Sequence, residues 1–426
     1  MTPTKPSLSP REQLSAVMTR LYAERLTTPS GGNLSVRDPD GGLWVTPSQL
    51  DKGRLSPELM VKIAADGSWT GEVKPTSEWA FHRAVLAARP DCRAVAHAHP
   101  TSLVAFSVVG QRLQLNQFPD LCRWVNRVEV SPYAIPGSEQ LGEHLAATFA
   151  TGCDATLMEN HGAVTVGRDL SEAFHRLDAL EHLATILLGG ARLGSLRPLG
   201  DADMQDARNR MARAWQSLAV DIGPQRELRE GLADYVRRAH GRSLLGARTG
   251  AISCRCGPGL LVVPDGADRA TLAAADLVYV EGDRAEDGKQ PDAMTPLHQA
   301  VYEARAHVRS LATALPPCLM AFAASGTPFD ARTIPEAYIF LKSVPSLPFA
   351  ARFAAAEVAA ALDEKTPALL VENACAVIAG ASPFAVFDRL EVAEFTARSA
   401  MDARAIGRLK PMPDEVLAEI CRIYNC

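Results

Sequence analysis

The chain of 426 residues is long enough for two or three domains, each with a core of its own. A net charge of −5 and the lack of any basic stretch exclude a nucleic-acid-binding surface and a basic membrane-surface helix. No apolar run approaches the ~18 residues of a membrane span. The nine cysteines include no CxxC pair, which fits reduced thiols, so we expect a cytoplasmic protein.

In chain order, the first half alternates helical periodicity with short runs of β-branched residues. The predicted elements are a helix at 11–26, a strand at 43–46, a helix at 77–89, strands at 93–98 and 155–159, and a long helix at 170–188. Strands separated by helices favour an α/β fold, although they do not fix the order of the strands in a sheet.

The strand at 93–98 introduces the most informative side chains. His97 and His99 are spaced i, i+2, which puts both imidazoles on one face of a strand. His161 follows another strand, and Glu78 lies in the first turn of a predicted helix. Three imidazoles and a nearby carboxylate suit zinc or a similar divalent ion. We therefore predict a metal site made by His97, His99 and His161, with Glu78 either as a fourth ligand or as a general base.

Small residues cluster at three points between these elements, namely SGGNLS (30–35), Thr46-Pro47-Ser48 and Thr76-Ser77. Loops of this kind can cradle a phosphate or a carboxylate with backbone N–H groups, although most of them are simply turns. All three lie close in sequence to strand ends or to the predicted metal site. They are therefore candidates for contacts with a substrate.

The second half of the chain repeats the first. KPTSEWAFHRAV (74–85) aligns with QPDAMTPLHQAV (290–301), and AVAHAHPTSLVAFS (94–107) with SLATALPPCLMAFA (310–323). Internal repetition of this length indicates a tandem duplication. The linker between the copies is rich in Gly, Pro and Asp, so we predict domains at 1–215 and 222–426.

The candidate metal ligands are absent from the second copy as a set. The aligned residues are Met294 for Glu78, Thr313 for His97, Leu315 for His99 and Ala374 for His161. Residues needed only for packing would not be expected to disappear together while the scaffold persists. His82, in contrast, recurs as His298, which favours a core or capping role for both. The sequence therefore predicts one metal ion per chain, bound by the first copy.

With these motifs in place, the first half closely resembles the class II aldolase/adducin family, typified by fuculose-phosphate aldolase and ribulose-phosphate 4-epimerase. The resemblance extends over about residues 11–190 and rests on GNLSV (32–36), TPS (46–48), PTSEW (75–79), HAH (97–99) and NHG (160–162). It implies two tandem three-layer α/β/α domains, each with a central mixed sheet flanked by helices. The second would be a degenerate pseudo-domain without metal ligands.

The resemblance also implies roles for individual residues. The three histidines would hold one divalent ion per chain, zinc first, with manganese, cobalt and iron as alternatives. Glu78 would be the acid/base residue. The positions that match the phosphate-binding residues of the family are Asn33, Ser48, Thr76 and Ser77.

Two positions depart from the family pattern. Gln49 stands where the family has a glycine after Thr-Pro-Ser, and glycine lets a backbone approach an anion closely. This departure suggests an anion other than phosphate, such as a carboxylate. Phe118 stands where fuculose-phosphate aldolase brings a tyrosine across a subunit interface as a proton donor, which weakens the case for that particular aldol reaction.

The expected function is a metal-dependent lyase that cleaves or forms a C–C bond of a small molecule through a metal-stabilised enediolate. The preferred reaction is that of an aldolase acting on a hydroxy-carbonyl or sugar-derived substrate. The alternatives are a decarboxylase of a carbonyl- or hydroxy-carboxylate, a sugar-phosphate epimerase and, from another class, a non-enzymatic adducin-like protein.

The resemblance finally predicts an assembly. The resemblance implies that single-copy relatives assemble as four-fold rings with active sites between neighbouring subunits. Two tandem chains could therefore build a similar ring as a homodimer or a higher even oligomer. FPDLCRW (118–124) aligns with IPEAYIF (334–340). Glu336 and Tyr338 are therefore candidates to reach the metal site of a partner chain.

Overall fold

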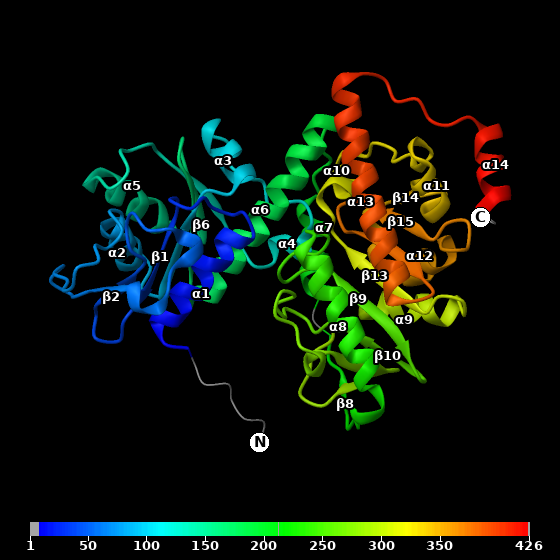
Figure 1. The fold of residues 1–426 in the computed structure, drawn as a ribbon, viewed down its shortest axis with the longest axis horizontal. Helices are drawn as coiled ribbons and strands as arrows, with labels where there is room; N and C mark the ends of the chain where they lie inside the picture. The colour runs from blue at the N-terminus through cyan, green and yellow to red at the C-terminus, as the bar shows by residue number, and fades with distance from the viewer. Residues whose placement is uncertain (1–7, 212, 425–426) are drawn as a thin grey trace. The chain divides into compact units, whose positions relative to one another are not determined.

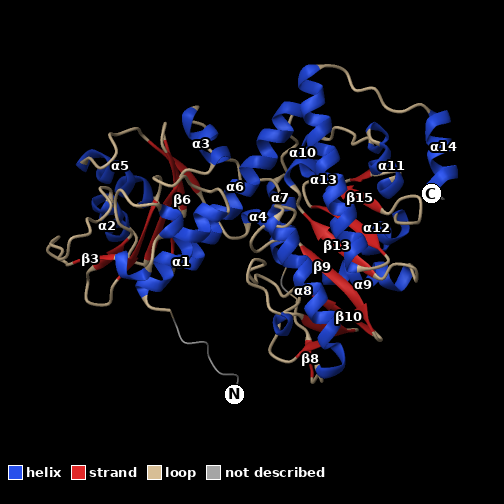
Figure 2. Ribbon diagram, in the orientation of Figure 1, coloured by secondary structure: helices blue, strands red, loops and turns tan. Residues whose placement is uncertain are grey.

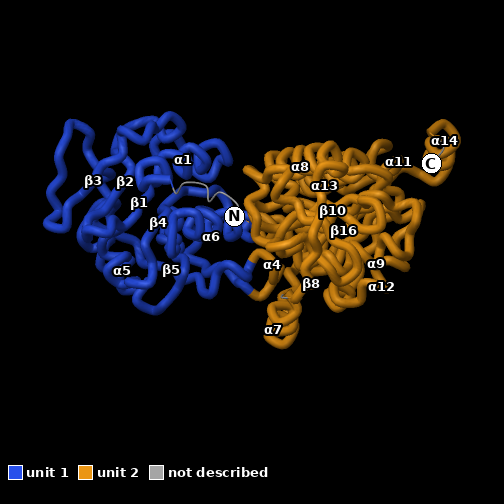
Figure 3. The backbone as a smooth tube through the Cα atoms, turned by 90° about the horizontal axis from the view of Figure 1, so that it is seen from below, with its two compact units in different colours: residues 1–115, 122–184 blue, residues 116–121, 185–426 orange. Residues whose placement is uncertain are grey.

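The computed structural model describes residues 8–211 and 213–424, which form two compact units. The first unit contains the chain up to Leu115 together with Cys122–Ala184. The second contains Asn116–Leu121 and the chain from Thr185 onward (Figure 3). In the described part of the chain, no helix is both long and apolar enough to cross a membrane.

The first unit is a mixed sheet with helices packed against it (Figures 1 and 2). Its described strands are β1 (Asn33–Arg37), β2 (Leu43–Val45), β3 (Val61–Ile63), β4 (Ala94–Ala98), β5 (Val128–Ser131), β6 (Ala155–Met158) and β7 (Gly162–Gly167). They form a seven-stranded sheet in the order β3-β2-β1-β4-β7-β6-β5, in which β5 and β6 are parallel and the other pairs antiparallel. The helices are α1 (Pro10–Ala23), α2 (Trp79–Ala88), α3 (Thr101–Val108) and α5 (Glu139–Phe149), with the short η1 (Lys52–Arg54) and η2 (Pro57–Leu59). Helix α6 (Leu170–Leu193) begins in this unit and ends in the second. The four-residue α4 (Pro119–Cys122) spans the boundary between the units.

Local sequence explains where these elements begin and what they bury. Ser9 and Glu12 form a capping box at the start of α1, with Pro10 in its first turn. All five residues of β4 are buried, as expected for a central strand covered on both faces. Helices α2 and α5 pack on each other, and their apolar side chains share one core with strand residues such as Val95 and Val164.

The second unit has the same strand order with two additional strands. Its described strands are β8 (Gln216–Leu218), β9 (Ala251–Cys256), β10 (Gly259–Val262), β11 (Val278–Glu281), β12 (Arg284–Glu286), β13 (Ser310–Ala314), β14 (Ser346–Leu347), β15 (Ala368–Val371) and β16 (Cys375–Gly380). The order is β14-β15-β16-β13-β9-β10-β11-β12-β8, in which the first seven match β5-β6-β7-β4-β1-β2-β3. In register, Thr313 opposite Ala251 in the second unit occupies the place of His97 opposite Asn33 in the first.

Helices flank the second sheet as well, as Figure 2 shows. They are α7 (Asp201–Arg210), α8 (Arg226–Gly241), α9 (Thr295–Ala304), α10 (Pro317–Ser325), α11 (Pro335–Leu341), α12 (Ala355–Ala361), α13 (Pro383–Ile406) and α14 (Asp414–Tyr424). The short helices are η3 (Gly223–Gln225), η4 (Ala274–Asp276), η5 (Ala331–Thr333) and η6 (Phe349–Phe353). The expected fold class, two α/β units with mixed sheets flanked by helices, is confirmed.

Two expectations about local structure were wrong. The small-residue segment 30–35 is not only a loop, because Asn33 begins β1 and pairs with both β2 and β4. Strand pairing here overrides the weak β propensity of Asn and Ser. Glu78 is the N-cap of α2 instead of part of its first turn, since helical geometry begins at Trp79.

Candidate active site

Three imidazoles converge at the end of β4 in the first unit. His97 lies within β4, His99 follows the end of the strand, and His161 lies in the tight turn between β6 and β7. The Nε2 atoms of His97 and His99 are 3.2 Å apart, and the ring centroid of His161 is 4.9 Å from that of His97. One candidate ligand atom from each ring lies within 4.8 Å of the others, so the three can face a common point.

The electrostatics of these rings fit a metal ligand set. His97 Nδ1 lies 3.0 Å from the carbonyl oxygen of Ala163, which in the donating tautomer leaves Nε2 facing the other rings. Burial lowers the pKa of His97 well below its ordinary value and that of His99 to about 4, and neighbouring imidazoles add to both shifts. Burial also lowers the pKa of His161, against the opposing charge of Glu78. Neutral imidazole is the form that binds a divalent ion, so these residues fit one.

The backbone next to the rings leaves no room for larger residues. A Cβ atom on Gly31 would lie 2.6 Å from His99 Nδ1, and one on Gly162 would lie 2.6 Å from His99 Cδ2. Asn160 has a φ of 54°, in the left-handed region that Asn tolerates better than most residues, and this turn presents His161. Gly31 lies directly before the GNLSV motif, and Gly162 is the glycine of the NHG motif, so both motifs border the site.

Glu78 completes the cluster from the start of α2. Its Oε2 accepts a hydrogen bond from Asn33 Nδ2 at 2.7 Å and lies 3.5 Å from His97 Nε2. Its Oε1 lies 3.8 Å from His161 Nε2 and has no hydrogen-bond partner among the described residues. A buried carboxylate with one unpartnered oxygen can exchange a proton with a substrate or contribute to a metal site.

A buried polar chain holds Glu78 in place. Asn33 donates to Glu78 through Nδ2, and its Oδ1 contacts His82 Nε2. His82 Nδ1 contacts Ser35 Oγ at 2.8 Å, and burial lowers the pKa of His82 to about 3, so the ring is neutral. His82 is indeed buried in α2, but its hydrogen bonds link it to the candidate active site. The sequence did not indicate this connection, because these partners are far apart along the chain.

The small-residue segments lie side by side next to Glu78. Pro47 and Pro75 form a bridge, Ser48 N donates to the carbonyl of Lys74 at 3.0 Å, and Thr76 N donates to that of Thr46 at 3.0 Å. Ser77 is exposed, and Ser48 is half-buried. The structure therefore brings Asn33, Ser48, Thr76 and Ser77 to the same end of the sheet.

Gln49 keeps the backbone conformation for which glycine is preferred. Its φ is 57°, so the turn after Thr-Pro-Ser takes the left-handed shape even without a glycine. The side chain of Gln49 is exposed. The substitution therefore leaves the shape of this turn intact, which weakens the argument from Gln49 against a phosphate.

Comparison with known proteins agrees with this geometry. Residues 12–188 and 230–401 both match the family described as Class II Aldolase and Adducin N-terminal domain. The chain belongs to the class II aldolase/adducin family.

Named relatives within the family include two kinds of enzyme. A 3-oxo-tetronate 4-phosphate decarboxylase of Escherichia coli K12 is 34% identical over 181 residues, 42% of this chain and 85% of that protein. A 5-methylthioribulose-1-phosphate/5-deoxyribulose-1-phosphate aldolase of Rhodospirillum rubrum is 36% identical over 155 residues, 36% of this chain and 69% of that protein. A solved L-fuculose 1-phosphate aldolase has 27% identity and a TM-score of 0.44, covering 48% of this chain and 96% of that one.

The second match to the family lacks the ligand set. The counterparts Met294, Thr313, Leu315 and Ala374 are all buried. His298 keeps the hydrogen bond of His82 to a serine, here Ser253 at 2.6 Å, and its Nε2 contacts Thr313 Oγ1 at 3.0 Å. Among the described residues, the group of potential metal-binding side chains close enough together to share one ion is the three histidines of the first unit.

The segment that carries Phe118 packs within the second unit. Phe118 is completely buried there with a φ of 49°, and its phenyl ring cannot donate a proton. Nearby, Arg352 donates to both carboxylate oxygens of Asp120, at 2.6 and 2.8 Å. The Arg352 side chain is only 3% exposed, so this ion pair fixes the segment in place.

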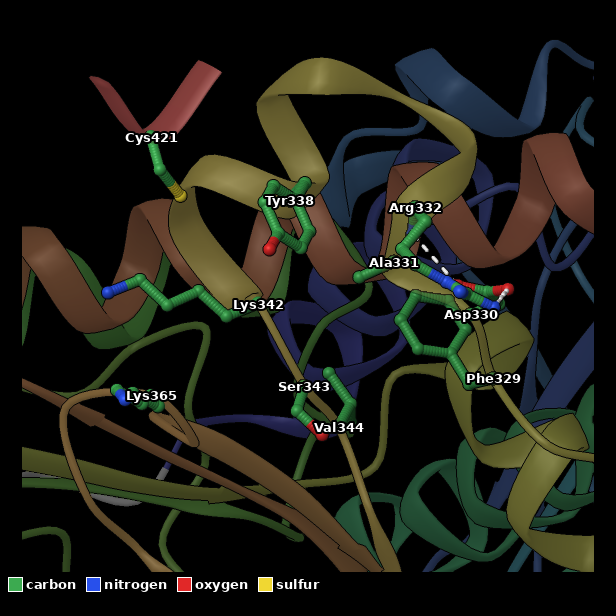
Figure 4. A pocket seen from close by; sticks show the side chains of 10 residues that line it. All are labelled: Phe329, Asp330, Ala331, Arg332, Tyr338, Lys342, Ser343, Val344, Lys365 and Cys421. Carbon is green, nitrogen blue, oxygen red and sulfur yellow. Dashed lines mark hydrogen bonds and ion pairs between the residues drawn. The ribbon is translucent and has the colours of Figure 1, made fainter. Parts of the chain in front are cut away.

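Tyr338 lines a separate pocket of the second unit, with a volume of about 560 Å³. Figure 4 shows Tyr338 between Cys421 and Lys342 on one side and Arg332, which is paired with Asp330, on the other. Glu336 is exposed and is not among the residues that line this pocket.

Proposed function

We propose that this chain is a metal-dependent lyase that cleaves a carbon–carbon bond beside a carbonyl group in a small phosphorylated substrate. The observation that carries the proposal is the convergence of the buried Glu78 and His97 with the half-buried His99 and His161. Relatives named as decarboxylase and aldolase support the reaction class.

The metal site would be formed by the first unit alone. We propose that His97, His99 and His161 hold one divalent ion per chain, with zinc first and manganese, cobalt or iron as alternatives. A bound ion of this kind supplies Lewis-acid stabilisation to the negative charge that develops on a carbonyl oxygen.

Glu78 is assigned the proton transfers. In an aldol cleavage, the carboxylate of Glu78 accepts the proton of the hydroxyl group as the adjacent C–C bond breaks; the bonding electron pair stays on the carbon beside the carbonyl, and Glu78 returns the proton to that carbon. In a decarboxylation, CO₂ leaves, the bonding electron pair stays on the carbon beside the ketone, and Glu78 delivers to that carbon a proton taken up from solvent. Asn33 orients the carboxylate for either task through its 2.7 Å hydrogen bond.

Asn33, Ser48, Thr76 and Ser77 are assigned to the anionic end of the substrate. Backbone pairing between the segments of Ser48 and Thr76 supports this assignment. Asn33 Nδ2 has a second hydrogen besides the one it gives to Glu78, so it can serve both groups.

We place decarboxylation of a phosphorylated 3-oxo acid first and aldol cleavage second. Phe118 has no hydroxyl group to replace the tyrosine that the resemblance assigns to fuculose-phosphate aldolase. Among the relatives, 34% identity to the decarboxylase extends over more of this chain than the match to the aldolase. The second candidate is favoured by the Rhodospirillum aldolase, which is 36% identical.

A product assay separates these candidates. The zinc-loaded protein would be incubated with 3-oxo-tetronate 4-phosphate and with 5-deoxyribulose 1-phosphate, with released CO₂ and aldehyde measured separately. We expect CO₂ from the first substrate. Aldehyde from the second alone would favour the aldolase, and a changed configuration without C–C cleavage would indicate an epimerase. No turnover of either by fully metal-loaded protein would contradict the proposal for these substrates.

We also propose that residues 1–215 and 222–426 are tandem copies and that the second is a pseudo-domain. The shared strand order and the two family matches support this interpretation. The corresponding assembly is a homodimer or higher even oligomer in which Glu336 and Tyr338 of one chain approach the metal site of a partner.

Light scattering and one substitution test the assembly. The expected mass is two chains or an even multiple. Tyr338→Phe should slow turnover without removing metal. The matched control is Tyr235→Phe, because Tyr235 packs against Phe387 within the second unit. A monomer whose kinetics do not change in Tyr338→Phe would contradict the assembly.

A further inference from the structure

Lys52 is a buried lysine at the edge of the candidate active site. It is only 3% exposed, although lysine is almost never fully buried without a partner. Its backbone N–H donates to the carbonyl of Pro29 at 2.9 Å, and Asp51 caps η1 through Gly53 N. The backbone is thus fixed, and the side chain points inward from it.

The ammonium group of Lys52 is incompletely satisfied. It donates to the carbonyl oxygen of Pro47 at 2.5 Å. Among the described residues, no second acceptor is within hydrogen-bond distance and no carboxylate is within ion-pair distance. Burial lowers the pKa of Lys52 to about 8, and the charge of Glu78 opposes that shift. A buried cation with one neutral partner is costly unless an anion joins it.

The position of Pro47 indicates which anion that is. Its carbonyl belongs to the turn that carries Ser48, and Pro47 is bridged to Pro75, the residue before Thr76. The ammonium group is therefore held at the junction of the two segments assigned to the anionic end of the substrate. Every other group assigned there is a neutral amide or hydroxyl, so Lys52 would supply the positive charge.

In the second unit, a cation at the corresponding position is paired within the protein. Arg269 stands five residues after Pro264, as Lys52 does after Pro47, and Pro264 is bridged to Pro291. Arg269 donates to the carbonyls of Gly250 and Ala267 and pairs with Asp292 at 3.4 Å. Asp292 follows Pro291 as Thr76 follows Pro75. An internal carboxylate thus faces the cation in the second unit, whereas a neutral threonine stands there in the first.

We propose that Lys52 is a specificity-determining residue that binds the anionic end of the substrate, a phosphate or a carboxylate, between the turn of Ser48 and the segment of Thr76. The inference rests on the proposed function for the identity of the substrate. Its test needs no turnover, because it measures the binding of simple anions.

The experiment is titration calorimetry with inorganic phosphate, and separately with acetate, against the zinc-loaded full chain. Lys52→Met should lower the affinity for the bound anion by about 10–100-fold, the effect expected for losing a hydrogen bond to a charged group. Lys52→Arg should restore part of the affinity because it restores the charge. The control is Lys62→Met, which removes a half-buried lysine paired with Asp38 and should leave the affinity unchanged.

The outcomes distinguish the two anions and the two proposals. Binding of phosphate alone assigns a phosphorylated substrate, and binding of acetate alone assigns a carboxylate. Equal affinity in Lys52→Met and wild type, or no binding of either anion by wild type, would overturn the role of Lys52. Failure of the lyase assay with intact, Lys52-dependent anion binding would instead count against the proposed function.

A measurement on the wild-type protein covers the case in which Lys52→Met does not fold. Amine acylation can be followed at Lys52 by peptide mass spectrometry with and without the anion. The bound anion should slow acylation of Lys52 and leave that of Lys62 unchanged. Equal acylation of Lys52 in both samples would overturn the proposal.

Discussion

The end of β4 in the first unit and the matching end of β13 in the second differ in which side chains they carry at the four positions of the candidate metal site. In the first unit, Glu78 Oε1 and His161 Nδ1 lack hydrogen-bond partners among the described residues. At the matching positions of the second unit, Met294 and Ala374 carry no polar side-chain group. The same backbone register thus supports either a cluster of buried and half-buried ionisable side chains or, at the same positions, side chains without ionisable groups.

The shared histidines show how little has to change between the two states. His82 and His298 both bond to a serine through Nδ1. Through Nε2, His82 reaches Asn33, which holds Glu78, whereas His298 reaches Thr313, the counterpart of His97. The comparison teaches that this buried histidine keeps its hydrogen bond to a serine in both units, and that its second hydrogen bond leads to Glu78 only in the unit that has Asn33.

Giving the first unit the residue of the second should produce the largest effect. His97→Thr copies Thr313 into β4, and we expect loss of bound metal and of activity because one of three imidazoles is gone. The fold should persist, since the second unit accepts threonine there. Elemental analysis and circular dichroism test this, with Thr313→Val as the control that should retain metal. Stoichiometric metal in His97→Thr would break the comparison.

Removing the proposed acid/base group should have the next largest effect. Glu78→Gln keeps the shape and the hydrogen bond from Asn33 but cannot take up a proton. Turnover should fall by about 10²–10⁴-fold, the usual range for a general acid or base, while metal is largely retained. Steady-state kinetics with a parallel metal assay would decide. Near-normal turnover would assign proton transfer to another group.

Loss of the orienting amide should cost less. Asn33→Ala copies Ala251 of the second unit and removes the 2.7 Å hydrogen bond to Glu78. We expect turnover to fall by about 10–100-fold, the range for residues that orient active-site groups. Asn33→Asp, which restores an oxygen but places a second carboxylate beside Glu78, should not recover activity. If Asn33→Ala is fully active, the polar chain from Ser35 does not position Glu78.

The smallest effect concerns stability in acid. Burial lowers the pKa of His298 to about 3, so from about pH 6.5 downward the unfolded chain takes up a proton that the folded unit does not. The free energy of unfolding should therefore fall as pH falls from about 6.5 toward 3, by up to about 1.4 kcal/mol per pH unit from this group. Urea unfolding between pH 7 and 5 should show a shallower pH slope in His298→Gln. Identical slopes would mean that His298 is not neutral in the folded protein.

The sequence by itself predicted the candidate metal-ligand set and a common scaffold for the two halves of the chain. Alternation along one strand places His97 and His99 together, and the absence of both from the aligned segment of the second half distinguished them from core residues. Fixed spacing between repeated segments also predicted the common strand scaffold, which the matching strand orders agree with. These signals are local or periodic, so they can be read without coordinates.

Tertiary structure decided how those residues are oriented and charged. Asn33 reaches Glu78 across 45 positions and His82 across 49, and no local pattern predicts such contacts. The charged sequence DKGR (51–54) would suggest an exposed lysine, but in the folded chain Lys52 is buried and donates to the carbonyl of Pro47. The left-handed φ of Gln49 likewise depends on the turn that its neighbours close. Burial and long-range hydrogen bonding arise only when distant segments pack, because a side chain's solvation and partners are properties of the folded chain.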